Sequence, residues 1–210
     1  MTAEVNREHA LAALRISAVS VAWTAVVSTL AISLGLSSST AVLVAFGAIG
    51  LVDGIGSVAL VAHFRHAVRH ERYHEGIERA AHQIVLVGLF VVGLLSVVQG
   101  TSRAIAGTAS ESTALTVGFT VAALVGGGTI ALVKRRIAIE VESPSLLSDS
   151  HVSAIGSIQA AIALLGAIAT EALGWAAADG IATAIIGAGA MVLAVRTWRA
   201  ELGNAEAPGR

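Results

Sequence analysis

Cysteine is absent from this chain of 210 residues, and proline occurs only twice. Without cysteine there is no disulfide and no thiolate metal ligand, so a metal site must use carboxylate, imidazole, hydroxyl or carbonyl groups. Charged residues are also scarce, at 13% of the chain, whereas soluble domains carry roughly a quarter. With 55% hydrophobic residues and a mean hydropathy of +0.81, the composition predicts an integral membrane protein in contact with lipid.

The sparse charges also argue against several functions. The net charge is -1, and the basic residues form short flanks of apolar segments instead of the basic surface that nucleic-acid binding needs. No nucleophile, base and orienting group occur together in the sequence, and there is no phosphate-binding glycine loop. We therefore expect neither an enzyme nor an organic cofactor nor a nucleic-acid partner.

Six apolar segments are long enough to cross a bilayer. Crossing roughly 30 Å of hydrocarbon takes about 20 apolar residues in a helix. The segments lie near residues 12–35, 40–63, 80–102, 113–133, 145–170 and 175–197. The sequence therefore predicts an all-α, six-helix transmembrane bundle over residues 12–199, with an N-terminal segment at 1–11 and a short tail at 200–210.

The basic residues fall almost entirely on one side of these spans. Arg103 alone lies in an outer connection. The others precede the first span, fill the second and fourth connections or follow the last span: Arg7, Arg15, Arg65, Arg69, Arg72, Arg79, Lys134, Arg135, Arg136, Arg196, Arg199 and Arg210. By the positive-inside rule, we expect both termini to be cytoplasmic. The compact length and the Ala, Gly, Val and Arg bias favour a bacterial plasma membrane.

Two aspartates lie inside the apolar spans. A carboxylate in a membrane helix costs roughly 3 kcal/mol on insertion scales, so it normally faces a bundle interior, a cavity or an ion path. Asp53 is followed four residues later by Ser57, and Asp149 by Ser153. Each aspartate thus shares a helix face with a hydroxyl. Two such helices facing each other would form an oxygen-rich cation site.

Histidines gather at the second cytoplasmic connection. His63, His66, His70 and His74 share one stripe if the second helix continues beyond the membrane. The stripe could bind Zn²⁺ through imidazole nitrogens, or collect cations at the inner mouth of the bundle. The alternative is a solvated, arginine-rich helix end that contacts lipid headgroups.

Asp179 has two interpretations. The sequence at 179–183 repeats the pattern at 53–57, which suggests a third ligand-bearing helix. Asp179 also lies near the outer start of the sixth span, where an aspartate can cap a helix and complement its dipole. We favour the capping role.

Glycines occur in three groups within the spans, at 54 and 56, at 126–128, and at 187 and 189. Small residues let membrane helices approach closely, so we expect tight helix contacts at these positions. Gly54 and Gly56 also flank Asp53, where missing side chains would leave room for a ligand.

The order of these motifs resembles that of the cation diffusion facilitators, a family of divalent-metal exporters. The resemblance covers residues 12 to 199. It is carried by LVDGIGS in the second span, the His70-x-x-x-His74 pair, SLLSDSHVSAIGS at the start of the fifth span and GWAAADGIATAII entering the sixth. It implies efflux of Zn²⁺, or of a related ion such as Mn²⁺ or Fe²⁺, usually in exchange for protons. It also implies a homodimer embedded in membrane lipid.

The chain departs from the family's usual ligand set. Family members pair ligands four residues apart in the second and fifth helices, but here Ser57 follows Asp53. In the fifth helix His151 is displaced, and Ile155 stands four residues after it. On a regular helix His151 points about 160° away from Asp149, so we do not expect both to hold one ion, although His151 stays a candidate ligand. Only a short tail follows the sixth span in the sequence, so we expect a short, divergent member that lacks the family's usual C-terminal soluble domain.

The predicted ligands are mostly oxygen atoms, which suit Mn²⁺, Fe²⁺ or Mg²⁺ about as well as Zn²⁺. Two other functions stay open at this point. A haem-binding electron carrier would use His63 and His151 as axial ligands. A non-transporting membrane protein could instead bind metal as an accessory to a partner.

Overall fold

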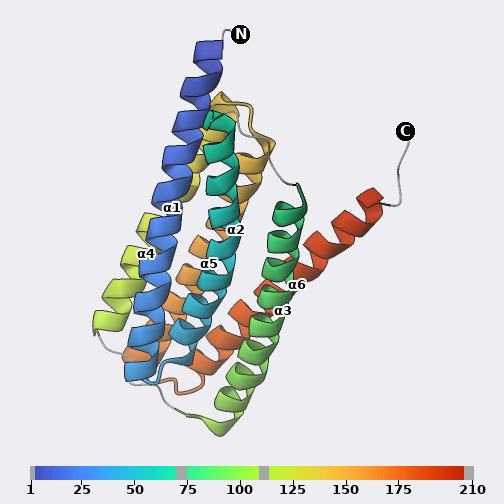
Figure 1. Cartoon of the computed structure of the whole chain (residues 1–210). Coiled ribbons are helices and arrows are strands. Elements are labelled where there is room, and N and C mark those ends of the chain that lie inside the picture. The colour runs from blue at the N-terminus through green and yellow to red at the C-terminus, as the bar shows by residue number, and fades with distance from the viewer. Residues whose placement is uncertain (1–2, 70–74, 109–113, 206–210) are drawn as a thin grey trace.

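A computed structural model of the chain describes residues 3–69, 75–108 and 114–205, which form six helices and no strand (Figure 1). The helices are α1 (Ala3–Ser37), α2 (Ala41–Arg69), α3 (Glu75–Ala106), α4 (Ala114–Glu140), α5 (Pro144–Leu173) and α6 (Ala178–Ala205). Each contains a stretch long and apolar enough to cross a membrane. The prediction of an all-α, six-helix transmembrane bundle is confirmed.

The helix boundaries follow local sequence chemistry. Ser143 caps α5 by accepting a hydrogen bond from the Leu146 backbone N–H, and Pro144 occupies the first turn, where its missing N–H costs nothing. Gly174 ends the same helix in the left-handed region, with φ of 61°. Glycine adopts that conformation without a steric penalty, so the chain can reverse there towards α6.

The six helices form a group of four and a pair. In Figure 1, α1 and α4 lie on one side of the molecule, α2 and α5 lie in the middle, and α3 and α6 lie on the other side. α3 packs mainly on α6, α1 on α2, and α4 on α5, while α6 also contacts α2 and α5. Because the helices alternate in direction, α1 begins and α6 ends towards the same end of the bundle (Figure 1).

The α3–α6 pair is held at backbone distance by facing glycines. A Cβ atom added at Gly93 would lie 2.7 Å from the carbonyl oxygen of Gly187, and one at Gly100 would lie 2.5 Å from that of Gly180. The close approach expected at Gly187 is therefore present, whereas Gly189 faces open space. The two helices can pack this closely only because no side chain stands between them.

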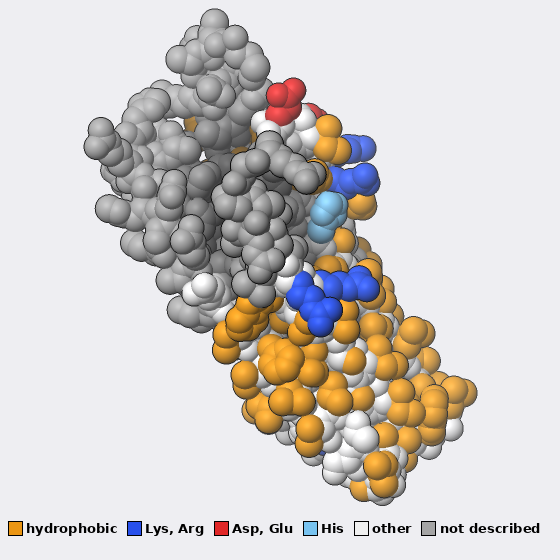
Figure 2. All heavy atoms as spheres, turned by 90° about the vertical axis from the view of Figure 1, so that its right-hand side faces the viewer, with side chains coloured by type: hydrophobic (Ala, Val, Ile, Leu, Met, Phe, Trp, Pro, Cys, Tyr) orange, Lys and Arg blue, Asp and Glu red, His pale blue; other side chains and the backbone are white. Residues whose placement is uncertain are grey.

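The outer surface of the bundle is suited to lipid. Large apolar side chains are exposed on every helix, for example Val19, Leu51, Leu95, Leu132, Leu165 and Val192. Figure 2 shows apolar side chains covering the lower part of one face, with basic side chains gathered where this apolar surface ends. Such a surface is stable against hydrocarbon and defines a multi-pass integral membrane protein.

The fourth helix is longer than the sequence predicted. The predicted span ended at residue 133, with Lys134 in the connection that follows, but α4 continues to Glu140. Arg135 and Arg136 are exposed, whereas the Lys134 side chain is fully buried, at 0% exposure. The assignment of Lys134 to the connection is therefore wrong. The helix continues past Lys134 because no proline or glycine occurs between Lys134 and Pro144. Successive residues of a helix are rotated by about 100°, so Lys134 can point inwards while Arg135 and Arg136 point outwards.

Candidate cation site

Asp149 is the centre of a polar cluster that joins three helices. It lies on α5, five residues after Pro144 and thus about 8 Å from the start of that helix. Ser57, on α2, donates a hydrogen bond of 3.1 Å from its Oγ to Asp149 Oδ1. The sequence predicted that α2 and α5 would face each other through these residues, and the structure brings them into contact.

Lys134 of α4 completes the cluster. Its Nζ lies 2.5 Å from Asp149 Oδ2, and it donates a hydrogen bond of 2.9 Å to Ser153 Oγ. The side chain of Lys134 is 0% exposed and that of Asp149 is 11% exposed. An unpaired charge at this depth would be very costly, so the two charges stabilise each other. Both oxygens of Asp149 are thus occupied, one by a hydroxyl and one by an ammonium group.

The sequence analysis missed Lys134 as a site residue. It grouped Lys134 with Arg135 and Arg136 as a basic flank of the membrane. One signal was nevertheless present: Lys134 is the only lysine in the chain, and every other basic residue except the histidines is an arginine. A chain that uses arginine for all its flanking charges has a lysine at one position alone, and that position is buried.

Asp53 lies beside this cluster and faces a cavity. The cavity has a volume of about 80 Å³ and is lined by residues of all six helices. Its polar lining consists of Ser20, Thr24, Ser28, Asp53, Ser153, Ser157 and Gln159. Asp53 interacts electrostatically with Asp149 and Lys134, but within the described part of the chain its carboxylate takes part in no hydrogen bond or ion pair. The rest of the lining is apolar. A space of this size has room for water molecules or a partly hydrated ion, and these polar side chains offer them partners.

Ser153 connects the cavity to the ion pair, since it both lines the cavity and accepts the hydrogen bond from Lys134. The site therefore contains two carboxylates, one ammonium group and several hydroxyls. With all three ionisable groups charged, its net charge is −1. A net negative charge and oxygen atoms are features that favour cations. Among the described residues Asp149 is already paired, whereas Asp53 is not.

Histidine does not contribute to this cluster among the side chains that the structure describes. His151 is exposed, whereas Asp149 and Ser153 are partly buried. No group of three or more His, Asp or Glu side chains that could hold a metal ion occurs in the described residues. Among the described side chains, the ligands for an ion at this site would be the carboxylates of Asp53 and Asp149 and hydroxyl groups, together with water. Such oxygen ligands suit the harder cations.

The predicted histidine stripe is described only in part. His63 and His66 lie on α2, which continues to Arg69 as the stripe requires, but their side chains are not among those described. His70 and His74 lie outside the described residues. The role of these four histidines in metal entry stays a prediction.

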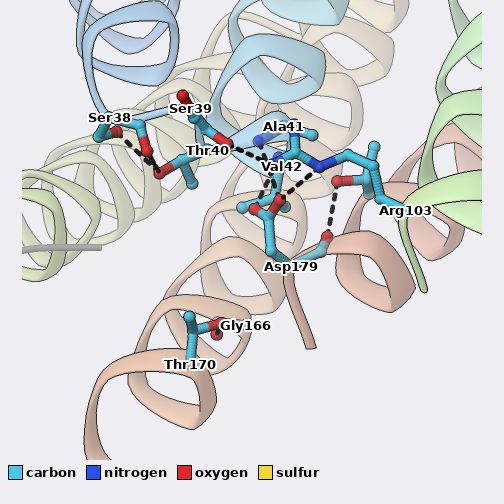
Figure 3. Close-up of polar contacts among 10 residues, drawn as sticks. Ser38, Ser39, Thr40, Ala41, Val42, Arg103, Gly166, Thr170 and Asp179 are labelled. Atoms are coloured by element: carbon cyan, nitrogen blue, oxygen red, sulfur yellow. Dashed lines mark hydrogen bonds and ion pairs between the residues drawn. The ribbon is translucent and has the colours of Figure 1, made fainter. Parts of the chain in front are cut away.

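Asp179 lies in a second polar cluster, drawn in Figure 3. It is near the start of α6, at the opposite end of the bundle from the start of α5, where Asp149 lies. Its carboxylate, 1% exposed, accepts hydrogen bonds of 3.0 and 3.1 Å from the backbone N–H groups of Ala41 and Val42 at the start of α2. Arg103 of α3 lies 3.6 Å from the same carboxylate and donates a hydrogen bond to the Ser39 carbonyl oxygen. Asp179 thus caps a helix, as favoured from the sequence, but the helix is the neighbouring α2 and not its own α6.

The contacts of Asp179, here called the Asp179 cluster, tie α2, α3 and α6 together. The cap satisfies two N–H groups that would otherwise lack partners at the start of α2, and it places a negative charge at the positive end of the helix dipole. The Asp179 carboxylate has its contacts with Ala41, Val42 and Arg103, at the far end of α2 from Ser57. The structure therefore does not bring Asp179 together with Asp149 and Ser57.

Six apolar spans around a charged, hydroxyl-lined cavity are typical of membrane transporters. Residues 16–202 match the family model described as the cation efflux transmembrane domain, so the chain belongs to the cation efflux family. A search of curated proteins found no match. The family supports a metal cation as the transported substrate and thus identifies the protein as a membrane-embedded cation transporter.

Proposed function

We propose that the protein exports a divalent metal cation, Zn²⁺ or a related ion, through the site formed by Asp53 and Asp149. One observation carries this proposal: Asp53 faces a hydroxyl-lined cavity, has no hydrogen-bond or ion-pair partner among the described residues and lies within electrostatic range of Asp149. A carboxylate at membrane depth is costly, and such residues typically face a cavity and mark the path of a substrate or an ion. Ser57 and Ser153 supply further oxygen ligands from the same two helices.

The chemistry of the ligands favours weak, partly hydrated binding. Zn²⁺ is held best when some ligands are imidazole or thiolate, and neither occurs in the described part of this site. Carboxylates and hydroxyls accept Mn²⁺, Fe²⁺ or Mg²⁺ about as well. Weak binding suits transport, because an ion must leave the site as well as enter it.

The direction and coupling of transport complete the proposal. The cluster around Asp149 lies near the end of the bundle where α1 begins and α6 ends. The positive-inside pattern predicts that this end is cytoplasmic, so cations would enter from the cytoplasm of a bacterial cell. Exchange for protons and a homodimeric assembly are implied by the family resemblance and stay predictions.

Gradient-driven uptake into proteoliposomes tests the proposed function. Purified protein is reconstituted, a proton gradient is imposed, and uptake of Zn²⁺, Mn²⁺ and Fe²⁺ is measured with Asp53→Ala alongside. We expect uptake of at least one ion that collapses when a protonophore removes the gradient and that is lost in the variant. Uptake equal to that of protein-free liposomes for every ion would show that the proposal is wrong.

A second function is favoured by one observation. Because the Lys134 ammonium already occupies Asp149 Oδ2, the protein could bind metal weakly and serve a partner without transporting ions itself. Isothermal titration of the purified protein with the same ions separates the two functions. Binding without flux supports the accessory role, whereas binding with gradient-dependent flux supports the transporter.

A further inference from the structure

The position of Lys134 gives the cation site an unusual resting state. Its Nζ lies 2.5 Å from Asp149 Oδ2, a distance at which a bound cation would contact the same oxygen. Asp149 Oδ1 accepts a hydrogen bond from Ser57 at the same time. A transported ion therefore cannot use Oδ2 while the ammonium group remains there.

We propose that the Lys134 ammonium is a tethered substitute for the transported cation, bound to Asp149 when the site is empty and displaced when the cation binds. This proposal rests on the proposed function of cation transport, to which it adds a residue, Lys134, that sets the affinity of the site. The second contact of Lys134 is to Ser153 Oγ, and Ser153 itself lines the cavity, so the ammonium lies next to a residue of the cavity wall. The displaced group therefore has a partly polar cavity to move into.

The choice of lysine supports this role. An ammonium group is a compact point charge on a flexible four-carbon stem, so it resembles a metal ion and can withdraw by changing rotamer. A guanidinium group is planar and binds a carboxylate through a fixed fork, which makes it a poorer substitute for a spherical ion. Lys134 is the single lysine in the sequence. All other Lys+Arg residues, including the adjacent Arg135 and Arg136, are arginines.

Charge explains how the tethered group would help release. With Asp53, Asp149 and Lys134 all charged, the net charge of the site is −1, and a divalent ion changes it to +1. The positive charge of the displaced ammonium then opposes the ion from inside the same cavity, which weakens binding. Replacing Lys134 by methionine removes this competition and leaves two carboxylates for one divalent ion. We expect the Lys134→Met variant to bind Mg²⁺ about tenfold more tightly or better.

The single lysine also provides the test. Protein labelled with ¹³C-lysine and purified in detergent has one Lys134 side-chain signal in its NMR spectrum, because no other lysine is present. The wild type is titrated with Mg²⁺ and, separately, with Zn²⁺, and the Cε signal is followed alongside isothermal titration. We expect the signal to move in a saturable way, with the same dissociation constant as the heat of binding. In Asp149→Asn we expect the Lys134 Cε signal to start near the chemical shift that the wild type reaches with bound cation. Adding Mg²⁺ or Zn²⁺ should then not move it.

The outcomes separate this proposal from the proposed function. Cation binding or transport with an unmoved Lys134 signal would overturn the tethered-substitute proposal and leave the transporter in place. Absence of both binding and flux would overturn the proposed function, and this proposal with it. Lys134→Arg serves as the charge-conserving control. Its guanidinium group keeps the positive charge and binds the carboxylate through a fixed fork, so we expect its cation affinity to be no higher than that of the wild type, while Lys134→Met shows the increase. Equal affinities for the two variants would also contradict the proposal. The measurement on the wild type does not depend on whether Lys134→Met folds.

Discussion

Breaking the buried ion pair from one side should destabilise the protein far more than removing both of its charges. In Asp149→Leu the Lys134 ammonium, at 0% exposure, would keep Ser153 as its one hydrogen-bond partner among the described residues. Removing one partner of a buried pair costs about 3–5 kcal/mol, because the remaining charge is uncompensated. Replacing both partners by apolar residues of similar volume is often neutral. We therefore expect Lys134→Met and Asp149→Leu to be severely destabilising alone and close to the wild type when combined.

Thermal unfolding in detergent measures this difference. A loss of 3–5 kcal/mol in a chain of this size lowers Tm by about 6 to 20 °C, at roughly 2–4 °C per kcal/mol. The double variant should recover most of that loss. With each single variant losing about 3–5 kcal/mol, the double-mutant cycle then gives a coupling free energy about as large as the two single losses together, about 6–10 kcal/mol. If the decreases in Tm of the two single variants simply add, the double variant is less stable than either of them. That result would contradict the claim that the ion pair with Asp149 allows Lys134 to be buried.

Further predictions concern the Asp179 cluster and the α3–α6 contact, each with a matched control variant. Asp179→Asn loses the charge that pairs with Arg103 and cannot keep this contact together with the hydrogen bonds from Ala41 and Val42. We therefore expect the free energy of unfolding to fall by about 1–3 kcal/mol. The control variant Glu171→Gln, at an exposed carboxylate, should change the free energy of unfolding by less than about 0.5 kcal/mol. Gly100→Val places a side chain against the Gly180 carbonyl oxygen, so the helices must separate at a cost of about 1–3 kcal/mol. Gly189→Ala meets open space and should leave Tm unchanged or slightly raised. Equal Tm values for Gly100→Val and Gly189→Ala would contradict the glycine contact.

The six spans could be predicted because membrane helices are set by local composition and length. Each span needs only enough apolar residues in sequence, and this property is read without knowing which helix lies next to which. The contact between Ser57 and Asp149 followed from the same logic, since polar groups in lipid must face the interior of the bundle.

Lys134 could not be assigned from its position alone. A basic residue at the end of an apolar stretch is normally a solvated flank, and Arg135 and Arg136 behave in that way. Whether the residue one step earlier points inwards depends on the rotation of α4 against α5, which is a matter of tertiary packing. The cap on α2 was missed for the same reason, because Asp179 and Ala41 are 138 residues apart in the chain.

The central claim is that cations pass through the site of Asp53 and Asp149, and one comparison tests it most directly. Cation uptake driven by a proton gradient is measured in proteoliposomes for the wild type, Asp53→Asn and the exposed-carboxylate control Glu171→Gln. The account predicts that uptake is abolished in Asp53→Asn and preserved in Glu171→Gln, with all three proteins reconstituted to the same level. Uptake by Asp53→Asn equal to that of the wild type would contradict it, because the open carboxylate in the cavity would then have no part in transport.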